Sequence, residues 1–328
     1  MTDSSFERLF TDDELAHMCR SGTQRMNEAL ADQTPAEAWA TYEEMEGAMR
    51  GFCTVYLDWL ALTDEYVFEV HGHQSHAAAM RPERVTELAV RTGMSLDDLL
   101  LGQALVAGPE NRLTAEMREA IDTGDHSRAM QTWHEVERIL RDVHDLRRDL
   151  ISDLLGWIYR EFGVDGLVAA QEYCAPRGWW KESMPRDFAL DPKQRLSELL
   201  FFLTVGAFSE QAVTEEPERW IVHQLVCGNC GRQVRDRYGD GSWGLDIVTE
   251  QGPVTFGQPE LTIYQTHLAV IHHMYAIDLV GAPWPSFECS GMRAGAEPCQ
   301  LIVYKDPSQT APEYYEVVGR RVPAGDRA

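Results

Sequence analysis

The sequence predicts an α+β fold in which a helical region is followed by a smaller domain of helices and strands. Three observations support this: two long stretches with helical spacing of apolar residues, an internal repeat that relates them, and short β-branched and aromatic runs after residue 174. At roughly 150 residues per domain, the 328 residues correspond to about two domains. We therefore divide the chain into a helical domain, 1–174, and an α+β domain, 175–328.

Two long amphipathic helices are expected in the first domain. The segment 34–37, Thr-Pro-Ala-Glu, begins one of them with a capping hydroxyl, a proline at the first helical position and a glutamate three residues on. Apolar residues then recur three or four positions apart, which is the spacing of one helix face. They are Tyr42, Met45, Met49, Phe52, Tyr56, Trp59 and Tyr66. A second stripe consists of Trp133, Val136, Leu140, Val143, Leu150, Leu154 and Trp157.

An internal repeat relates the two stripes. When residues 26–58 are aligned with 117–149, nine of 33 positions are identical, against about two expected by chance. The alignment predicts a duplicated unit of a short helix, a turn and a long helix, over 26–72 and 117–166. We expect the two copies to pack with their apolar stripes facing each other.

The second domain is expected to begin after a loop rich in proline, glycine and tryptophan. The paired Trp179 and Trp180 in this loop are candidates for the wall of a ligand cleft between the domains. Apolar and β-branched runs predict the strands, and helical patterns predict two further helices. The strands are expected at 220–226, 243–249, 301–304 and 314–318, and the helices at 194–208 and 261–280.

The charge of the chain excludes several classes of partner. With 29 basic and 53 acidic residues, the net charge is −24, which repels nucleic-acid phosphates and anionic lipids. No apolar run approaches the roughly 20 residues of a membrane-spanning helix, and the first residues are acidic, unlike a secretory signal. We therefore expect a cytoplasmic protein without a nucleic-acid or membrane partner.

Four of the seven cysteines lie between residues 227 and 299, and this cluster is the most informative feature of the sequence. Cys227 and Cys230 are two residues apart, and each is followed by a glycine, in the sequence Cys-Gly-Asn-Cys-Gly. Two thiolates at this spacing can bind one tetrahedral metal ion, while the glycines allow the chain to turn. The segment resembles the knuckle of zinc-ribbon and treble-clef proteins. A thioredoxin-like redox pair is less consistent with it, because that motif opens a helix after a strand.

The other ligands are expected from the same domain. We select His267, on the buried-looking face of the predicted helix 261–280, and Cys299, which leads into a predicted strand. Cys289 is the alternative to Cys299. In a regular helix, His272 would lie about 140° around the axis from His267, so we do not expect these two to share a metal.

Thiolate-rich sites favour zinc, although iron is also compatible with them. Four protein ligands would make the zinc structural, whereas three would leave a place for an activated water molecule. In the second case Arg232 could bind an anionic substrate and Tyr264 could donate a proton. The alternative for these two is that Arg232 pairs with an acidic residue and Tyr264 packs in the core.

A further candidate is the His144-Asp145 pair with Asp149, which is similar to the metal-binding dyad of helical phosphohydrolases. Because Asp142, Asp145, Asp149 and Asp153 share one flank of the predicted helix, we interpret them as a solvated acidic face. The function predicted from the sequence is that of a zinc enzyme acting on a small molecule in the interdomain cleft. The alternative is a non-catalytic scaffold with a structural zinc, which binds a basic protein partner or a second copy through its acidic helices.

Overall fold

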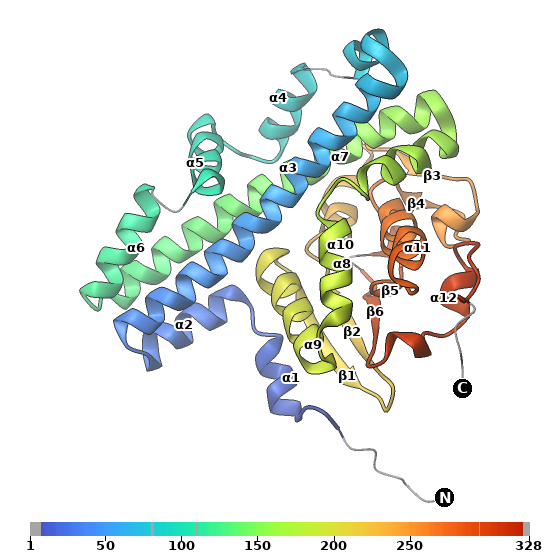
Figure 1. The fold of residues 1–328 in the computed structure, drawn as a ribbon. Helices are drawn as coiled ribbons and strands as arrows, with labels where there is room; N and C mark the ends of the chain where they lie inside the picture. The colour runs from blue at the N-terminus through green and yellow to red at the C-terminus, as the bar shows by residue number, and fades with distance from the viewer. Residues whose placement is uncertain (1–7, 80–81, 109–110, 295, 324–328) are drawn as a thin grey trace, which may run out of the picture.

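Two long helices cross the molecule and pack against each other, α3 (Pro35–Ala79) and α7 (His126–Cys174). The computed structural model describes residues 8–79, 82–108, 111–294 and 296–323. Figure 1 shows α3 and α7 side by side, with the second half of the chain on one side of them. The apolar residues predicted for the α3 stripe are all buried, and those of the α7 stripe are buried except for the half-buried Leu150.

Each long helix is preceded by a short one and bent at a glycine. α2 (Gly22–Asp32) precedes α3, and α6 (Arg112–Asp122) precedes α7. Gly72 in α3 and Gly163 in α7, 91 residues apart, have φ of 83° and 68°, a region that favours glycine. The predicted order of a short helix, a turn and a long helix is thus present twice.

Smaller helices surround this pair. They are α1 (Asp12–Met18), α4 (Pro82–Arg91), α5 (Leu96–Ala107), α8 (Trp180–Ala189) and α9 (Pro192–Phe201), which continues as a π-helix, Phe202–Gly206. Within the described residues, no helix is long and apolar enough to cross a membrane.

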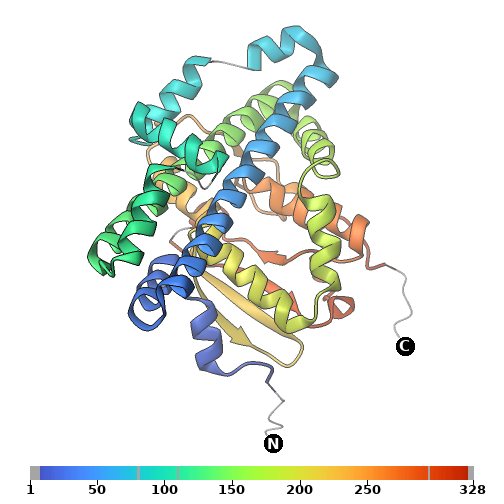
Figure 2. The same ribbon diagram turned by 60° about the vertical axis from the view of Figure 1, so that its left-hand side comes forward.

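The second half of the chain contains an antiparallel sheet in the order β1-β2-β6-β5. Its strands are β1 (Glu210–Glu215), β2 (Arg219–Val226), β6 (Cys299–Tyr304) and β5 (Ser286–Glu288). β2 is paired with β6 so that Gln224 lies opposite Cys299, and β5 is paired with β6 so that Glu288 lies opposite Gln300. In Figure 2 the strands lie below the two long helices.

Short elements connect these strands. They are α10 (Cys230–Gln233), a π-helix (Val234–Tyr238), β3 (Ile247–Val248), β4 (Leu261–Thr262), a second π-helix (Leu268–Tyr275), α11 (Ala276–Val280) and α12 (Glu313–Glu316). Single 3-10 turns occur at Pro253–Thr255, Gly291–Arg293 and Pro307–Gln309.

The structure corrects several predicted elements. The predicted strand 243–249 is reduced to Ile247–Val248, and the predicted loop with Trp179 and Trp180 leads into helix α8. The segment 314–318, predicted as a strand, begins with helix α12, because Tyr314 and Tyr315 are anchored through their hydroxyls to Glu288 and to the carbonyl oxygen of Gly281. The predicted helix 261–280 begins instead with strand β4 and continues as a π-helix before α11.

The largest apolar core draws on both halves of the chain. It contains Tyr56 and Trp59 from α3 together with Trp220 from β2 and Leu301 from β6. The space between the helical region and the sheet is therefore filled by side chains from both, and the cavity described below lies among them.

Candidate functional site

The two cysteines of the predicted knuckle lie next to each other. Cys227 follows β2 and Cys230 begins α10, and their sulfur atoms are 3.4 Å apart. All described cysteines are free. The turn between them depends on Gly228, because a Cβ atom at this position would lie 1.6 Å from the carbonyl oxygen of Ala207.

Cys289 and Cys299 complete a run of neighbouring sulfur atoms. Hydrogen bonding to Cys230 and then to Cys289 lowers the pKa of Cys299 to about 3. The hydrogen bond from Cys230 also lowers the pKa of Cys227, whereas the pKa values of Cys230 and Cys289 are raised well above their ordinary value by these contacts and by burial. The four thiols are thus in contact in the order 227, 230, 299, 289. Among the described residues, however, no group of three or more His, Cys, Asp or Glu side chains has the geometry of a metal site.

His267, the fourth predicted ligand, lines the same cavity as Cys227, Cys230 and Cys299. Its ring packs against the rings of Trp59, Tyr264 and His272. In the described part of the chain, no hydrogen bond or ring contact joins it to a cysteine. The structure therefore brings Cys227, Cys230 and Cys299 together with Cys289, and places His267 in an aromatic environment.

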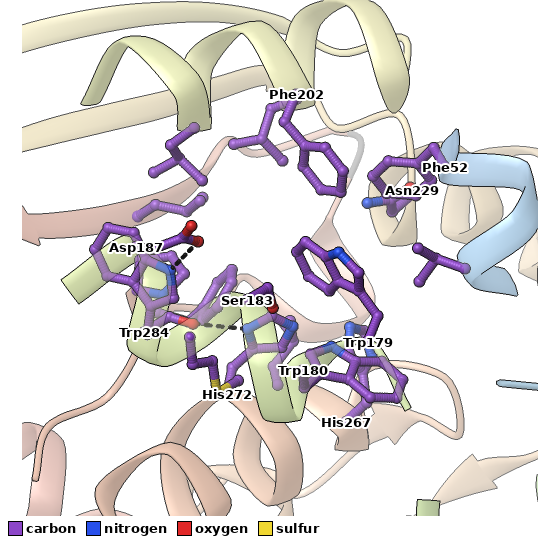
Figure 3. Close-up of a pocket in the computed structure, with 18 of the residues that line it drawn as sticks. Phe52, Trp179, Trp180, Ser183, Asp187, Phe202, Asn229, His267, His272 and Trp284 are labelled. Carbon is purple, nitrogen blue, oxygen red and sulfur yellow. Dashed lines mark hydrogen bonds between the residues drawn. The ribbon is translucent and has the colours of Figure 1, made fainter. Parts of the chain in front are cut away.

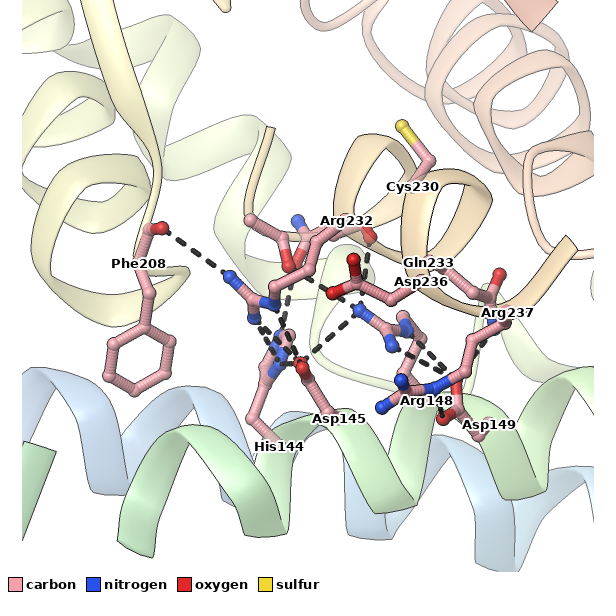
Figure 4. A network of polar contacts seen from close by, with 12 residues as sticks. His144, Asp145, Arg148, Asp149, Phe208, Cys230, Arg232, Gln233, Asp236 and Arg237 are labelled. Atoms are coloured by element: carbon pink, nitrogen blue, oxygen red, sulfur yellow. Dashed lines mark hydrogen bonds and ion pairs between the residues drawn. The ribbon is translucent and has the colours of Figure 1, made fainter. Parts of the chain in front are cut away.

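Arg232, the predicted anion-binding residue, is held in a buried polar network (Figure 4). Its Nε and Nη2 atoms donate to the two carboxylate oxygens of Asp145 at 2.8 and 2.6 Å. Asp145 also accepts hydrogen bonds from His144 and Arg148. Although burial alone would raise the pKa of Asp145, the charges of Arg148 and Arg232 hold it well below its usual range. This is the pairing with an acidic residue that the sequence left as the alternative.

The acidic flank of α7 is not a solvated face, which corrects that interpretation. Asp145, Asp149 and Asp153 are buried, and only Asp142 is partly exposed. Asp149 accepts from Arg148, Gln233 and Arg237, and Asp153 accepts from Arg84. Besides Arg148 of α7 itself, these carboxylates face cations from the second half of the chain or from α4, and sequence periodicity contains no information about those distant partners.

A cavity of about 300 Å³ lies between α3, α8, α9 and the knuckle (Figure 3). Its walls are mainly apolar and rich in aromatic rings, and both Trp179 and Trp180 contribute to them. The aromatic lining residues are Phe52, Tyr56, Trp59, Trp179, Trp180, Phe201, Phe202, Tyr264, Trp284 and Phe287. The uncharged polar ones include Ser183, Gln224, Asn229, His267 and His272, and the charged ones are Arg186, Asp187, Arg195 and Glu198. Cys227, Cys230 and Cys299 line the cavity as well.

His267 and His272 both line the cavity because the helix that carries them is not regular. The residues after His267 form a π-helix, in which hydrogen bonds join residues five apart. The two histidines, five residues apart, therefore lie on the same side, with ring centroids 5.5 Å apart. The expectation from a regular helix, that they would lie about 140° apart, was wrong.

Both imidazoles line the cavity, and both have Nδ1 bonded to a backbone carbonyl. Nδ1 of His267 bonds to the carbonyl oxygen of Tyr264 at 2.5 Å, and Nδ1 of His272 to that of Trp284 at 2.7 Å. A carbonyl can only accept, so in each ring the proton resides on Nδ1. Burial lowers the pKa of His267 to about 3 and that of His272 to about 4, so both rings are neutral at pH 7. Each Nε2 is then an acceptor.

Tyr264, the predicted proton donor, lines the cavity three residues before His267. Its hydroxyl is hydrogen-bonded to that of Tyr56. Burial and the neighbouring Tyr56 raise the pKa of Tyr264 well above its ordinary value, so its hydroxyl keeps its proton. Arg232 is absent from the described lining, so the structure does not bring the two predicted catalytic residues to one site.

Two further polar atoms in the cavity wall are buried without a hydrogen-bond partner among the described residues. They are Oγ of Ser183 and Nε1 of Trp59, and their residues are 3% and 2% exposed. A buried polar atom left unpaired is costly, and such atoms are uncommon in native proteins. Ser183 and Asp187 belong to no motif, so the sequence contained no sign of them, whereas His272 was considered and set aside on the geometry of a regular helix.

The chain matches no family model, no curated protein and no solved structure in the comparisons made.

Proposed function

We propose that the chain binds a small, largely aromatic molecule in this cavity and recognises a hydrogen-bond donor on it. The observation that carries the proposal is the pair of Nε2 lone pairs on His267 and His272, fixed by their Nδ1 bonds inside an aromatic box. A ligand with a hydroxyl or N–H group can donate to them, whereas a second acceptor in the same place would be left unpaired.

The volume and the lining of the cavity restrict the size, shape and charge of the ligand. A volume of about 300 Å³ fits one or two fused rings with small substituents. Aromatic walls favour a flat ligand that can stack or meet a ring edge. Both histidines are neutral, so they do not attract an anion by charge. The charged lining residues, Arg186, Asp187, Arg195 and Glu198, carry equal numbers of both signs, so we expect the lining to favour a ligand without net charge.

A matched pair of probes tests the proposal. 2-Naphthol carries one hydroxyl donor, and 2-methoxynaphthalene has nearly the same shape without it. We expect the wild-type protein to bind 2-naphthol about five-fold more tightly than 2-methoxynaphthalene. This factor corresponds to about 1 kcal/mol, the net contribution of one neutral hydrogen bond. Quenching of the fluorescence of Trp59, Trp179 and Trp180 reports the titration.

The variants His267→Phe and His272→Phe keep a ring and remove the acceptor. In these variants the ratio of the affinity for 2-naphthol to that for 2-methoxynaphthalene should fall towards one. His134→Phe, at an exposed position on α7, should leave this ratio unchanged. Equal affinity of the wild-type protein for both probes, or no binding of either, would contradict the proposal.

Catalysis at this cavity remains a prediction from the sequence. A zinc ion bound by Cys227, Cys230, His267 and Cys299, as predicted from the sequence, would adjoin the cavity, and Tyr264, which also lines it, would be the proton donor. The non-catalytic scaffold remains the alternative, and it predicts that neither probe binds.

We also propose that the helix pairs α2–α3 and α6–α7 arose by duplication. The support is the sequence repeat together with the two kink glycines, Gly72 and Gly163, at corresponding positions.

A further inference from the structure

We propose that Cys227, Cys230, Cys289 and Cys299 together bind one zinc ion as four thiolates. This set differs from the one predicted from the sequence, since Cys289 takes the place of His267. It does not depend on the ligand proposed for the cavity.

The strand register brings the four cysteines to one end of the sheet. Gln224 in β2 lies opposite Cys299 in β6, and Cys227 follows three residues after Gln224. Glu288 in β5 lies opposite Gln300 in β6, and Cys289 is the next residue after Glu288. Backbone pairing therefore brings together two segments separated by about 60 residues.

Backbone and amide N–H groups point at the sulfur atoms. Ser290 N donates to Sγ of Cys299 at 3.3 Å, and Gly291 N donates to Sγ of Cys289 at 3.4 Å. The side chain of Gln265 also donates to Sγ of Cys289, at 3.4 Å. Such donors orient thiolate ligands and offset part of their charge.

Both cysteine turns require glycine, as a knuckle does. A Cβ atom at Gly228 would overlap the carbonyl oxygen of Ala207, and Gly291 has φ of 57° with Oε1 of Gln258 2.1 Å from its Cβ position. The first turn is also anchored from α7, since Arg148 donates to the carbonyl oxygen of Asn229 at 3.1 Å. The knuckle is therefore fixed by the buried network of Figure 4.

The sulfur spacing is near that of a tetrahedral site. Zinc–sulfur bonds of about 2.3 Å place adjacent sulfur atoms about 3.8 Å apart, and Cys227 and Cys230 are 3.4 Å apart. Because the described residues do not already form a metal group, binding includes rotation of these side chains toward one centre. Each ligand that is still a thiol releases its proton to solvent, whereas Cys299, with a pKa of about 3, is already a thiolate. Four thiolates with Zn²⁺ leave a net charge of −2.

Zinc analysis of the purified full-length chain and X-ray absorption at the zinc edge test the proposal. We expect one zinc per chain, with four sulfur neighbours at about 2.3 Å and no nitrogen neighbour near 2.0 Å. Cys289→Ser and Cys299→Ser should lose zinc, whereas His267→Ala should keep it. Cys53→Ser, at a buried free cysteine outside the cluster, is the matched control.

Several results would overturn the proposal. One is an absorption spectrum with a nitrogen neighbour, together with loss of zinc in His267→Ala. The others are iron in place of zinc, a disulfide between Cys227 and Cys230, and a reduced protein that takes up no zinc when zinc is added back. The X-ray absorption spectrum of the wild-type protein identifies the zinc ligands even if a cysteine variant does not fold. The naphthol titration is independent of these results, so either proposal can fail alone.

Discussion

Arg232 and Asp145 form a buried, two-point ion pair that joins the knuckle to the long helix α7. Nε and Nη2 of Arg232 reach the two carboxylate oxygens at 2.8 and 2.6 Å, and Arg148 adds a second cation to the same carboxylate at 3.2 Å. Planar guanidinium groups suit this bidentate geometry. The pair fixes the segment that carries Cys227 and Cys230 against the helical region.

Removal of the shared carboxylate should therefore be costly. Asp145→Ala leaves two buried guanidinium groups without their common partner, and we expect a loss of about 3–5 kcal/mol in the free energy of unfolding. Urea denaturation of the variant and the wild-type protein measures this difference in the free energy of unfolding. Asp142→Ala, on the same helix but partly exposed, should cost below about 1 kcal/mol. Equal effects of the two variants would show that the network contributes little.

The stability should decrease with acid over a defined pH range. Burial lowers the pKa of His267, His272 and His273 to about 3, 4 and 3, from an ordinary value of 6.5. The unfolded chain therefore binds more protons than the folded one between pH 6.5 and about 4. Each histidine should lower the free energy of unfolding by up to about 1.4 kcal/mol per pH unit as the pH falls through this range.

Urea titrations between pH 7.5 and 4.5 follow this effect. The dependence on pH should be smaller in His267→Phe than in the wild-type protein, and unchanged in His134→Phe, whose side chain is exposed. A flat profile from pH 6.5 to 4.5 would mean that these imidazoles are not held neutral.

Gly228→Ala should disrupt the cysteine turn. The added methyl group has no room beside the carbonyl oxygen of Ala207, so the backbone of the knuckle must move. We expect both a lower unfolding midpoint and a loss of bound zinc. Gly51→Ala in α3 has nothing within 4 Å of the new Cβ atom, and it should stabilise the helix by about 0.5–1 kcal/mol. A Gly228→Ala protein with normal zinc content and stability would contradict the proposed site.

The variant Tyr264→Phe tests whether the hydroxyl of Tyr264 stabilises the fold or takes part in ligand binding. The variant leaves the buried hydroxyl of Tyr56 without its partner, and we expect a cost of about 1–3 kcal/mol in stability. Affinity for 2-naphthol should change less than two-fold, because the histidines are intact. Tyr159→Phe removes a hydroxyl that bonds to the exposed Glu250, and serves as the control. If Tyr264→Phe lost much of its affinity for 2-naphthol and Tyr159→Phe did not, the group that accepts the ligand's hydrogen bond would be Tyr264 instead of the histidines.

The sequence predicted what depends on local periodicity and spacing. The buried stripe through Tyr42 and Trp59 follows from the helical repeat, and the cysteine turn follows from Cys227, Cys230 and their glycines. The α+β class followed from the change in pattern after residue 174.

What the sequence could not predict depends on contacts between distant segments. Asp145 and Asp149 looked solvent-exposed because their partners, Arg232 and Arg237, are more than 80 residues away. His272 was set aside because a π-helix leaves no signal in residue periodicity. Cys289 was predicted only as an alternative to Cys299, because the pairing of β5 with β6, which places the two side by side, involves distant segments.

The state of the two imidazoles in the cavity is the central claim, and nitrogen-15 NMR of the histidine side chains tests it most directly. At pH 7 we predict that His267 and His272 are both neutral with the proton on Nδ1, and that 2-naphthol shifts the Nε2 resonances of both rings. A protonated ring, the opposite tautomer, or Nε2 resonances that do not respond to saturating 2-naphthol would contradict the account.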